Sequence, residues 1–394
     1  MKVVVAPDKF KGSLTGAQAA DAIAAGVRDV LADAEIVEVP VADGGEGTVA
    51  AAVAAGFELR TAAVAGPTGA DHQAAFALRG STAVVELASA SGLDALPGGP
   101  DPLGATSRGT GDAIRAALDA GAREIVLGLG GSASTDGGAG LLVGLGARLL
   151  DESGAGLPDG GASLARLACV DLSGLDPRLV TTRFTLAADV DNPLLGVRGA
   201  AAVFGPQKGA TPAQVSQLDA ALARFVEVLD RVAGADCSGL AGQPGAGAAG
   251  GVGFAALALL GARRRSGFQV VAELVGLDAA LAGADAAITG EGSLDEQTLG
   301  GKTPAGVAAA ATDAGVPAHA VCGRSLLDDG ARAAAGFASV VALTDYEPDP
   351  AVCMRDAAGL ARRAGREIAQ HLAERPAGGG GTIGSPRRAK ELTP

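Results

Sequence analysis

The sequence predicts an α/β protein in which a parallel-sheet domain is interrupted by a second domain with a mixed sheet. The chain opens with strands that each lead through a loop into a helix, the pattern of a parallel sheet. Around residue 57 the pattern changes to short strands separated by turns, and from Ala284 the strand–helix alternation resumes. A length of 394 residues also favours two domains.

The opening segment predicts two strands, each followed by a loop and a helix. Residues 3–6 form an apolar run of strand type, and Thr15 with Gln18 has the spacing of a capping box at a helix start. Residues 36–39 predict the second strand, which runs into a Gly-rich acidic loop at 40–48. Both strands therefore deliver polar residues to the same expected edge of a sheet.

The middle of the chain predicts a meander followed by further strands and helices. Short strands are expected at 59–64, 74–78 and 83–87, because turn sequences such as Gly-Pro-Thr-Gly separate them. We then expect a helix at 111–120, strands at 124–129 and 184–188, and a long helix from Thr211, with an apolar helix after the loop at 244–251. This mixture indicates a sheet that is not purely parallel.

The last part of the chain returns to strand–helix alternation. Strands are expected at 285–288, 318–322 and 339–343, and helices at 304–314, 326–335 and 351–373. The predicted division is therefore a discontinuous domain, 1–62 plus 284–374, and an inserted domain, 63–283. Residues 375–394 are rich in Gly and Pro and are expected to be a disordered tail.

Composition and charge exclude several classes of function. The net charge of −13 argues against nucleic-acid or anionic-membrane partners, and the four scattered cysteines and three histidines do not form a zinc or disulfide pattern. The N-terminal valine run is too short for a signal peptide, and no apolar run has the length of a membrane span. We therefore expect a cytoplasmic protein with small-molecule partners, either a monomer or a homodimer.

Five Gly-rich loops carry the residues suited to phosphate chemistry. Each leaves a strand or precedes a helix. They carry Asp8/Lys9/Lys11/Ser13, Asp43/Glu46, Ser132/Thr135/Asp136, Asp189/Asp191/Asn192 and Glu291/Asp295/Lys302. Backbone N–H groups in such loops cradle phosphates, carboxylates hold Mg²⁺, and lysines neutralise a phosphoryl group in transfer. Single loops also have structural explanations: Asp136 could cap a helix, Asp189 a turn, and Lys9 and Lys11 could be solvated.

Standard nucleotide motifs do not explain these loops. Gly301-Lys302-Thr303 lacks the first glycine of a P-loop, because Glu296 stands there. The Gly128-x-Gly130-x-x-Ala133 segment resembles a dinucleotide fingerprint, which leaves a nucleotide-dependent oxidoreductase as an alternative.

Six longer stretches resemble one family. They are 6–26, 40–48, 128–140, 189–210, 244–253 and 288–308. The chain is similar in these stretches to bacterial glycerate kinases of the type I class, although Lys9 stands where a small hydroxyl residue is more usual. The resemblance implies ATP- and Mg²⁺-dependent phosphorylation of D-glycerate, with 2-phosphoglycerate favoured as product. It also implies a flavodoxin-like domain, an inserted mixed-sheet domain and an active site in the cleft between them. A kinase of a related hydroxy acid and a non-catalytic metabolite-binding protein are further alternatives.

The resemblance, taken with the loops, leads to a set of expected site residues. We expect catalytic roles for Lys11, Asp189, Asp191 and Asp295, with Asp189 and Asp191 also holding the metal. Nucleotide binding is expected at Gly130, Gly131, Ser132, Thr135, Gly247, Gly250 and Lys302. Substrate binding is expected at Lys9, Ser13, Asp43, Glu46 and Glu291. The carboxylate of glycerate also needs a cation, for which Arg198 and Lys208 are candidates.

Overall fold

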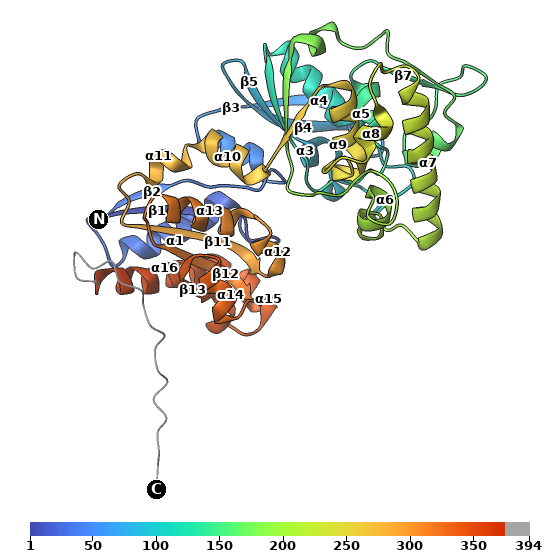
Figure 1. Cartoon of the computed structure of the whole chain (residues 1–394). Coiled ribbons are helices and arrows are strands. Elements are labelled where there is room, and N and C mark those ends of the chain that lie inside the picture. Colours follow the sequence, from blue (N-terminus) through green and yellow to red (C-terminus); the bar gives the residue numbers. More distant parts are fainter. Residues whose placement is uncertain (375–394) are drawn as a thin grey trace.

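A computed structural model describes residues 1–374 as two lobes, each built around its own sheet (Figure 1). One lobe contains the beginning and the end of the described chain, and the other contains its middle. The expected disordered tail, 375–394, lies outside the described residues.

The first lobe contains a five-stranded sheet in which every neighbouring pair is parallel. Its order is β13–β12–β11–β1–β2, formed by Phe337–Ala342, Ala318–Ser325, Ala286–Leu294, Lys2–Pro7 and Glu35–Glu38. When these five strands are numbered 1 to 5 in chain order, their order across the sheet is 5-4-3-1-2, which is that of a flavodoxin-like fold. The prediction of a flavodoxin-like sheet is confirmed. Connections leave in opposite directions on either side of β1 and β11, and ligands in such sheets bind at this switch point.

Alternating side chains of β1 pack on opposite faces of the parallel sheet. Val3 and Val5 join a core with α1 (Gly16–Arg28) and α16 (Ala357–Ala373), whereas Val4 and Ala6 join a core with α11 (Leu277–Leu281) and α13 (Thr303–Asp313). The sheet is thus covered by helices on both faces, which is why its strands read as continuous apolar runs.

Helices α1 and α16 lie close together because glycines face each helix at the contact. A Cβ on Gly26 would lie 2.0 Å from the carbonyl oxygen of Arg362, and one on Gly365 would lie 2.3 Å from that of Ile23. The first and last helices of the described chain therefore form one layer. The expected capping box of α1 is present, with Thr15 accepting from Gln18 N.

The second lobe contains a six-stranded mixed sheet. Its order is β10–β9–β6–β5–β4–β3, formed by Arg263–Arg265, Arg183–Ala187, Glu124–Gly128, Thr82–Glu86, Asp71–Arg79 and Glu58–Ala65. The pairs β3–β4 and β4–β5 are antiparallel, which confirms the predicted meander, and the other three pairs are parallel. A mixed sheet in the middle of the chain is therefore confirmed.

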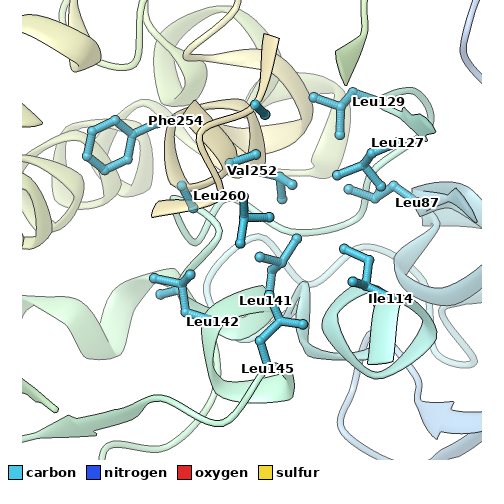
Figure 2. Close-up of a cluster of buried hydrophobic side chains, with 14 of the residues drawn as sticks. Leu87, Ile114, Leu127, Leu129, Leu141, Leu142, Leu145, Val252, Phe254 and Leu260 are labelled. Atoms are coloured by element: carbon cyan, nitrogen blue, oxygen red, sulfur yellow. The ribbon is translucent and has the colours of Figure 1, made fainter. Parts of the chain in front are cut away.

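One face of the mixed sheet carries the largest apolar core of the described chain. It is covered by α4 (Arg108–Asp119), α5 (Ala139–Gly144), α7 (Pro212–Asp230) and α9 (Ala248–Leu259). Figure 2 shows Leu127 of β6 facing Leu141 of α5 and Val252 of α9 in this core. The rings of Phe225 and Phe254 meet edge to face at 6.0 Å. The predicted long helix is α7, which begins with the expected capping box at Thr211.

Two helices connect the lobes. Val49 of α2 (Thr48–Ala54) and Val270 of α10 (Gly267–Val275) pack on the second face of the mixed sheet, while Phe268 of α10 packs in the core of the parallel sheet. The strands of the mixed sheet define a middle segment that runs from β3, which begins at Glu58, to β10. Helices α10 and α11 then lead the chain back to the parallel sheet. The limits 62/63 and 283/284 remain predictions for the domain boundaries.

The remaining elements are short. They are α3 (Leu87–Ser91), η1 (Leu93–Ala95), β7 (Arg148–Leu150), η2 (Gly161–Arg166), β8 (Cys169–Asp171), η3 (Pro177–Thr181), α6 (Ala200–Phe204), η4 (Pro206–Lys208), α8 (Cys237–Ala241), α12 (Glu296–Leu299), α14 (Asp329–Ala334), η5 (Leu343–Asp345) and α15 (Pro350–Arg355). The helix predicted at 351–373 is therefore two helices, α15 and α16. Among residues 1–374, no helix has both the length and the apolar character needed to cross a membrane.

Candidate functional site

A crevice of about 490 Å³ lies at the switch point of the parallel sheet. Its walls come from the loops after β1 and β2, from the carboxyl ends of β11 and β12, from the segment after β11, and from η5, α15 and the start of α16. Seven predicted site residues line it: Lys9, Lys11, Ser13, Asp43, Glu291, Asp295 and Lys302. Carboxyl ends of parallel strands meet at one edge of a sheet, and this is why loops nearly 290 residues apart in sequence converge here.

Asp8 is a buried acid in the wall of this crevice. It directly follows β1, and its oxygens accept hydrogen bonds from Lys9 N at 2.6 Å and Thr303 Oγ1 at 2.8 Å. Burial raises the pKa of Asp8 to about 6, and the negative charge of Asp43 adds to the rise. The sequence predicts Asp8 among the residues of this loop but assigns it no role. The feature that could have pointed to it is an acid at the end of a predicted buried strand.

Three predicted residues at the end of β11 and in the segment after it form a local network. Asp295 caps α12 by accepting from Gln297 N at 2.9 Å, and Thr298 Oγ1 donates to Glu291 at 2.5 Å. Lys302 stands at the N-cap of α13 and donates to the Gln297 side chain at 2.9 Å. Burial raises the pKa of Glu291 to about 7. Asp295 is therefore held as a helix cap, and all three residues line the cavity.

Asp189 lies between the two lobes with one oxygen free. Its Oδ1 accepts from Gly267 N at the start of α10 at 2.8 Å, and its buried Oδ2 receives no well-formed hydrogen bond from residues 1–374. Burial raises the pKa of Asp189, hydrogen bonds at the start of α10 oppose the rise, and the charge of Asp43 adds to it. An unpartnered carboxylate oxygen beside a second carboxylate is the hard-oxygen donor set that suits Mg²⁺, so these residues fit the metal.

Asp191 does not share the environment of Asp189. Its side chain is 68 % exposed and pairs with Arg264 Nη2 at 2.5 Å. In the described part of the chain, no three His, Cys, Asp or Glu side chains are grouped as a metal site. Mg²⁺ commonly completes its shell with waters and substrate phosphates, so a pair of carboxylates is enough to anchor it.

A second cavity, of about 500 Å³, adjoins the crevice and shares Asp8 and Lys9 with it. Lys9 Nζ donates to the backbone oxygen of Glu46 at 2.7 Å and lies 3.8 Å from the Glu46 carboxylate. The mixed-sheet lobe contributes Glu86, which accepts from Gly47 N and Val49 N at the start of α2. Lys9 therefore stands where the two cavities and the two lobes meet.

The predicted nucleotide-binding loops of the second lobe pack against each other. Ser132 accepts from Lys208 Nζ at 2.7 Å, and Gly137 N donates to Gly250 O at 2.9 Å. A Cβ on Gly250 would lie 2.0 Å from Ser134 O, and one on Gly247 would lie 2.3 Å from Pro193 O. These glycines allow close backbone packing, and a nucleotide-binding role for the two loops remains a prediction.

Gly130, Gly131, Thr135 and Asp136 occupy different places around the same loop. Gly130 approaches Gly45, Gly131 lines the second cavity, and the Thr135 side chain is buried. Asp136 accepts from Ser107, Gly138 N and Gly140 N, so its side chain holds the turn that leads into α5, whose N-cap is Gly138.

The two candidate partners for the glycerate carboxylate, Lys208 and Arg198, fall outside the crevice lining among the described residues. Lys208 is 2 % exposed and donates to Ser132 and Ser134 O, and burial lowers its pKa to about 7. Arg198 is exposed. Instead the crevice contains Arg324, which lies near the carboxyl end of β12 and donates to Ser293 at 3.2 Å. The signal for Arg324 was a cation two residues after the strand predicted at 318–322.

The fold and the crevice define a class: a doubly wound α/β protein with an inserted domain and a charged ligand site at its switch point. Residues 3–373 match the model of the glycerate kinase family. The chain is 45 % identical over 334 residues to glycerate 2-kinase of Escherichia coli K12, covering 84 % of this chain and 86 % of that protein. It is 43 % identical over 376 residues to glycerate kinase of Bacillus subtilis 168, covering 94 % and 98 %.

A solved structure has the same architecture throughout. The crystal structure of a Salmonella typhimurium LT2 protein assigned as glycerate kinase 2 superposes with a TM-score of 0.81 at 42 % identity, covering 95 % of this chain and 98 % of that one. The chain therefore belongs to the glycerate kinase family, a family of enzymes.

Proposed function

We propose that this protein transfers the γ-phosphoryl group of ATP to D-glycerate and releases 2-phosphoglycerate and ADP. The observation that carries the proposal is the crevice itself, which combines four cations, Lys9, Lys11, Lys302 and Arg324, with the buried acid Asp8 and the half-buried acid Glu291. Phosphoryl transfer requires mainly positioning and charge neutralisation, and this combination supplies both. Membership of the glycerate kinase family supports the acceptor, and the name of the Escherichia coli relative supports position 2.

The cations of the crevice are suited to the phosphates of ATP. Lys11 is exposed to the cavity, and Lys302 sits at the N-cap of the eleven-residue helix α13. A lysine at a helix N-terminus is unfavourable unless an anion is also bound, because the helix dipole already makes that end positive. A phosphate at Lys302 would be stabilised by both the lysine and the helix.

The acids of the cleft have two proposed roles, binding the metal and accepting the proton of the substrate. Asp189, through its free Oδ2, and Asp43 would hold Mg²⁺, which supplies charge neutralisation for the nucleotide phosphates. Asp8 faces both cavities and is suited to accept the hydroxyl proton of glycerate, because burial raises its pKa to about 6, close to the working pH. In this division Asp191 acts through Arg264, and Asp295 positions α12.

Lys9 is our candidate for binding the carboxylate of glycerate. It stands at the junction of the two cavities, and Glu46 fixes its side chain from the loop after β2. Bound there, the substrate would have its hydroxyl near Asp8, the next residue. The cytoplasmic location and the choice between monomer and homodimer remain predictions.

The oxidoreductase alternative receives no support from the fingerprint-like segment. A Cβ on Gly130 would lie 2.5 Å from the Cα of Gly45, so this glycine serves packing between two loops. A kinase of a related small hydroxy acid stays the competing proposal, because the acceptor-binding residues recognise a carboxylate and a hydroxyl that such acids share.

The proposal is tested by incubating the protein with ATP, Mg²⁺ and D-glycerate and identifying the product by NMR. We expect ADP and 2-phosphoglycerate in equal amounts. A panel of other hydroxy acids at equal concentration separates the competing proposal, which predicts a higher kcat/KM for one of them. Absence of glycerate-dependent ADP release would contradict the proposal, and release of 3-phosphoglycerate would correct the position.

A further inference from the structure

The crevice at the switch point is larger than glycerate requires. Its volume is about 490 Å³, within the range of about 300–1,000 Å³ that holds drug-sized ligands. Glycerate has only about seven non-hydrogen atoms, far fewer than a drug-sized ligand. Most of the crevice is therefore available to the other substrate of a kinase.

One wall of the crevice is apolar. It is formed by η5, α15 and the first residue of α16, through Leu343, Pro350, Cys353, Met354 and Ala357. Leu343, Cys353 and Ala357 are almost fully buried in the core beneath, whereas the side chain of Met354 is 48 % exposed. A single exposed apolar side chain is ordinary, but this one lies against a cavity with a buried apolar floor.

The apolar wall touches the loop that carries Lys11. Gly12 has a φ of +79°, and a Cβ placed on it would lie 3.0 Å from Met354 Cε. The glycine therefore permits both the left-handed backbone and the close approach of the methionine. The cations suited to phosphates and the apolar surface therefore line the same cavity next to each other.

The neighbouring cavity is less suited to a polyphosphate. Among the described residues that line it, Lys9 is the one cation, and it is accompanied by four carboxylates, those of Asp8, Glu46, Glu86 and Asp94. A nucleoside triphosphate carries several negative charges, and like charges nearby oppose its binding. The crevice also has four carboxylates, those of Asp8, Asp43, Glu291 and Asp295, but four cations, Lys9, Lys11, Lys302 and Arg324, balance them. The crevice is thus the better site for the donor.

We propose that the apolar wall centred on Met354 is the nucleobase subsite of the phosphoryl donor, a purine nucleoside triphosphate whose phosphates lie at Lys11 and Lys302. This inference rests on the proposed kinase function. A flexible, polarisable thioether packs well against an aromatic face, so Met354 provides a surface for the base. The subsite also places the donor mainly on the parallel-sheet lobe, leaving Lys9 and Asp8 at the cleft for the acceptor.

A single-tryptophan reporter tests the subsite. The chain has no tryptophan, so Met354→Trp creates a unique fluorophore at the wall. We expect ADP to quench its emission with saturation, and inorganic tripolyphosphate or D-glycerate to leave it unchanged. Leu326→Trp is the matched control, because Leu326 is 64 % exposed on the same lobe after β12 and lies outside the crevice lining in the described chain. Its emission should not respond to ADP.

Wild-type protein provides a second test that does not depend on a variant. Photolabelling with 8-azido-ATP should modify a peptide within residues 343–357, with protection by ATP and none by D-glycerate. In steady-state kinetics Met354→Glu should raise the KM for ATP about tenfold, equivalent to about 1.4 kcal/mol, with the KM for glycerate unchanged.

The outcomes separate the subsite from the function. Two results would overturn the subsite alone. One is normal glycerate phosphorylation with the photolabel confined to 130–137 or 244–251. The other is an emission of Met354→Trp that does not change at saturating ADP. No ATP-dependent turnover of glycerate by wild-type protein would instead overturn the proposed function.

Discussion

Two groups of Gly-rich loops look alike in the sequence but differ in the structure. The loop after β1 and the end of β11 with the segment after it leave Lys11, Glu291 and Lys302 facing a cavity. The loops at 130–138 and 244–251 pack on each other, and the first of them binds the buried cation Lys208 through Ser132 and Ser134. Glycine beside an acid or a hydroxyl therefore indicates either a ligand loop or a tightly packed junction. What distinguishes them is whether the nearby cation is exposed to a cavity or satisfied inside the protein.

The largest expected effect compares the exposed lysine with the buried one. Lys11→Met should lower kcat by about 10²–10³, the usual loss of one charge-stabilising group in an active site, with little change in stability. Lys208→Met should instead lower the free energy of unfolding by about 1–3 kcal/mol, because Ser132 Oγ and Ser134 O lose a buried partner. Steady-state kinetics and urea unfolding measure both. Equal kcat losses at normal stability would mean that the packed loops also act in catalysis.

The second prediction compares the two acids after β9. Asp189→Asn should lower kcat by about 10²-fold or more, because it weakens the proposed anchor of Mg²⁺, and should raise the Mg²⁺ concentration needed for half-maximal activity. Asp191→Asn should cost less than about tenfold, because Asp191 is exposed and bound to Arg264. Mg²⁺ titrations of turnover measure both effects. If both variants kept near-wild-type turnover at saturating Mg²⁺, the metal role of this segment would be wrong.

The third prediction is an opposite dependence of stability on pH for the two regions. Burial lowers the pKa of Lys208 from 10.5 to about 7, so between these values the unfolded chain binds more protons and Lys208 makes stability rise with pH. Burial raises the pKa of Glu291 from 4.5 to about 7, so between pH 4.5 and 7 the folded protein binds more protons and Glu291 makes stability fall as pH rises.

Urea unfolding at a series of pH values measures the two slopes. Lys208→Met should flatten the curve above pH 7, and Glu291→Gln should flatten it between pH 4.5 and 7. A wild-type slope that survives either substitution in its own window would show that another group is responsible.

The smallest expected effect compares the helix caps of the two lobes. Thr15→Ala and Thr211→Ala each remove a capping box and should each cost about 1 kcal/mol of stability. Thr15 also lines the second cavity, so only Thr15→Ala is expected to change the KM for glycerate. A KM change in Thr211→Ala at unchanged stability would contradict this division between the lobes.

Much of the fold followed from the sequence because its signals are local. Apolar runs predicted all five strands of the parallel sheet, turn sequences predicted the meander β3–β4–β5, and the capping pairs predicted the starts of α1 and α7. Helices α10 and α11 were missed. Phe268 and Val270 of α10 pack in two different cores.

The candidate site was predictable as a set of loops but not as a set of contacts. Seven expected residues line one crevice, because parallel strands deliver their carboxyl ends to one edge. The separation of Asp191 from Asp189 was not predictable, because Asp191 pairs with Arg264, about seventy residues later. Asp8 gained its place from Thr303, almost three hundred residues away.

The sequence by itself determined which segments form strands and helices, where Gly-rich loops occur, and which family the chain resembles. These depend on neighbours along the chain: periodicity, caps and turn residues. Only the tertiary structure decided which of those loops face a cavity. That choice depends on burial and on long-range partners, which leave Lys11 exposed at the crevice and enclose Lys208 beneath the glycine loops.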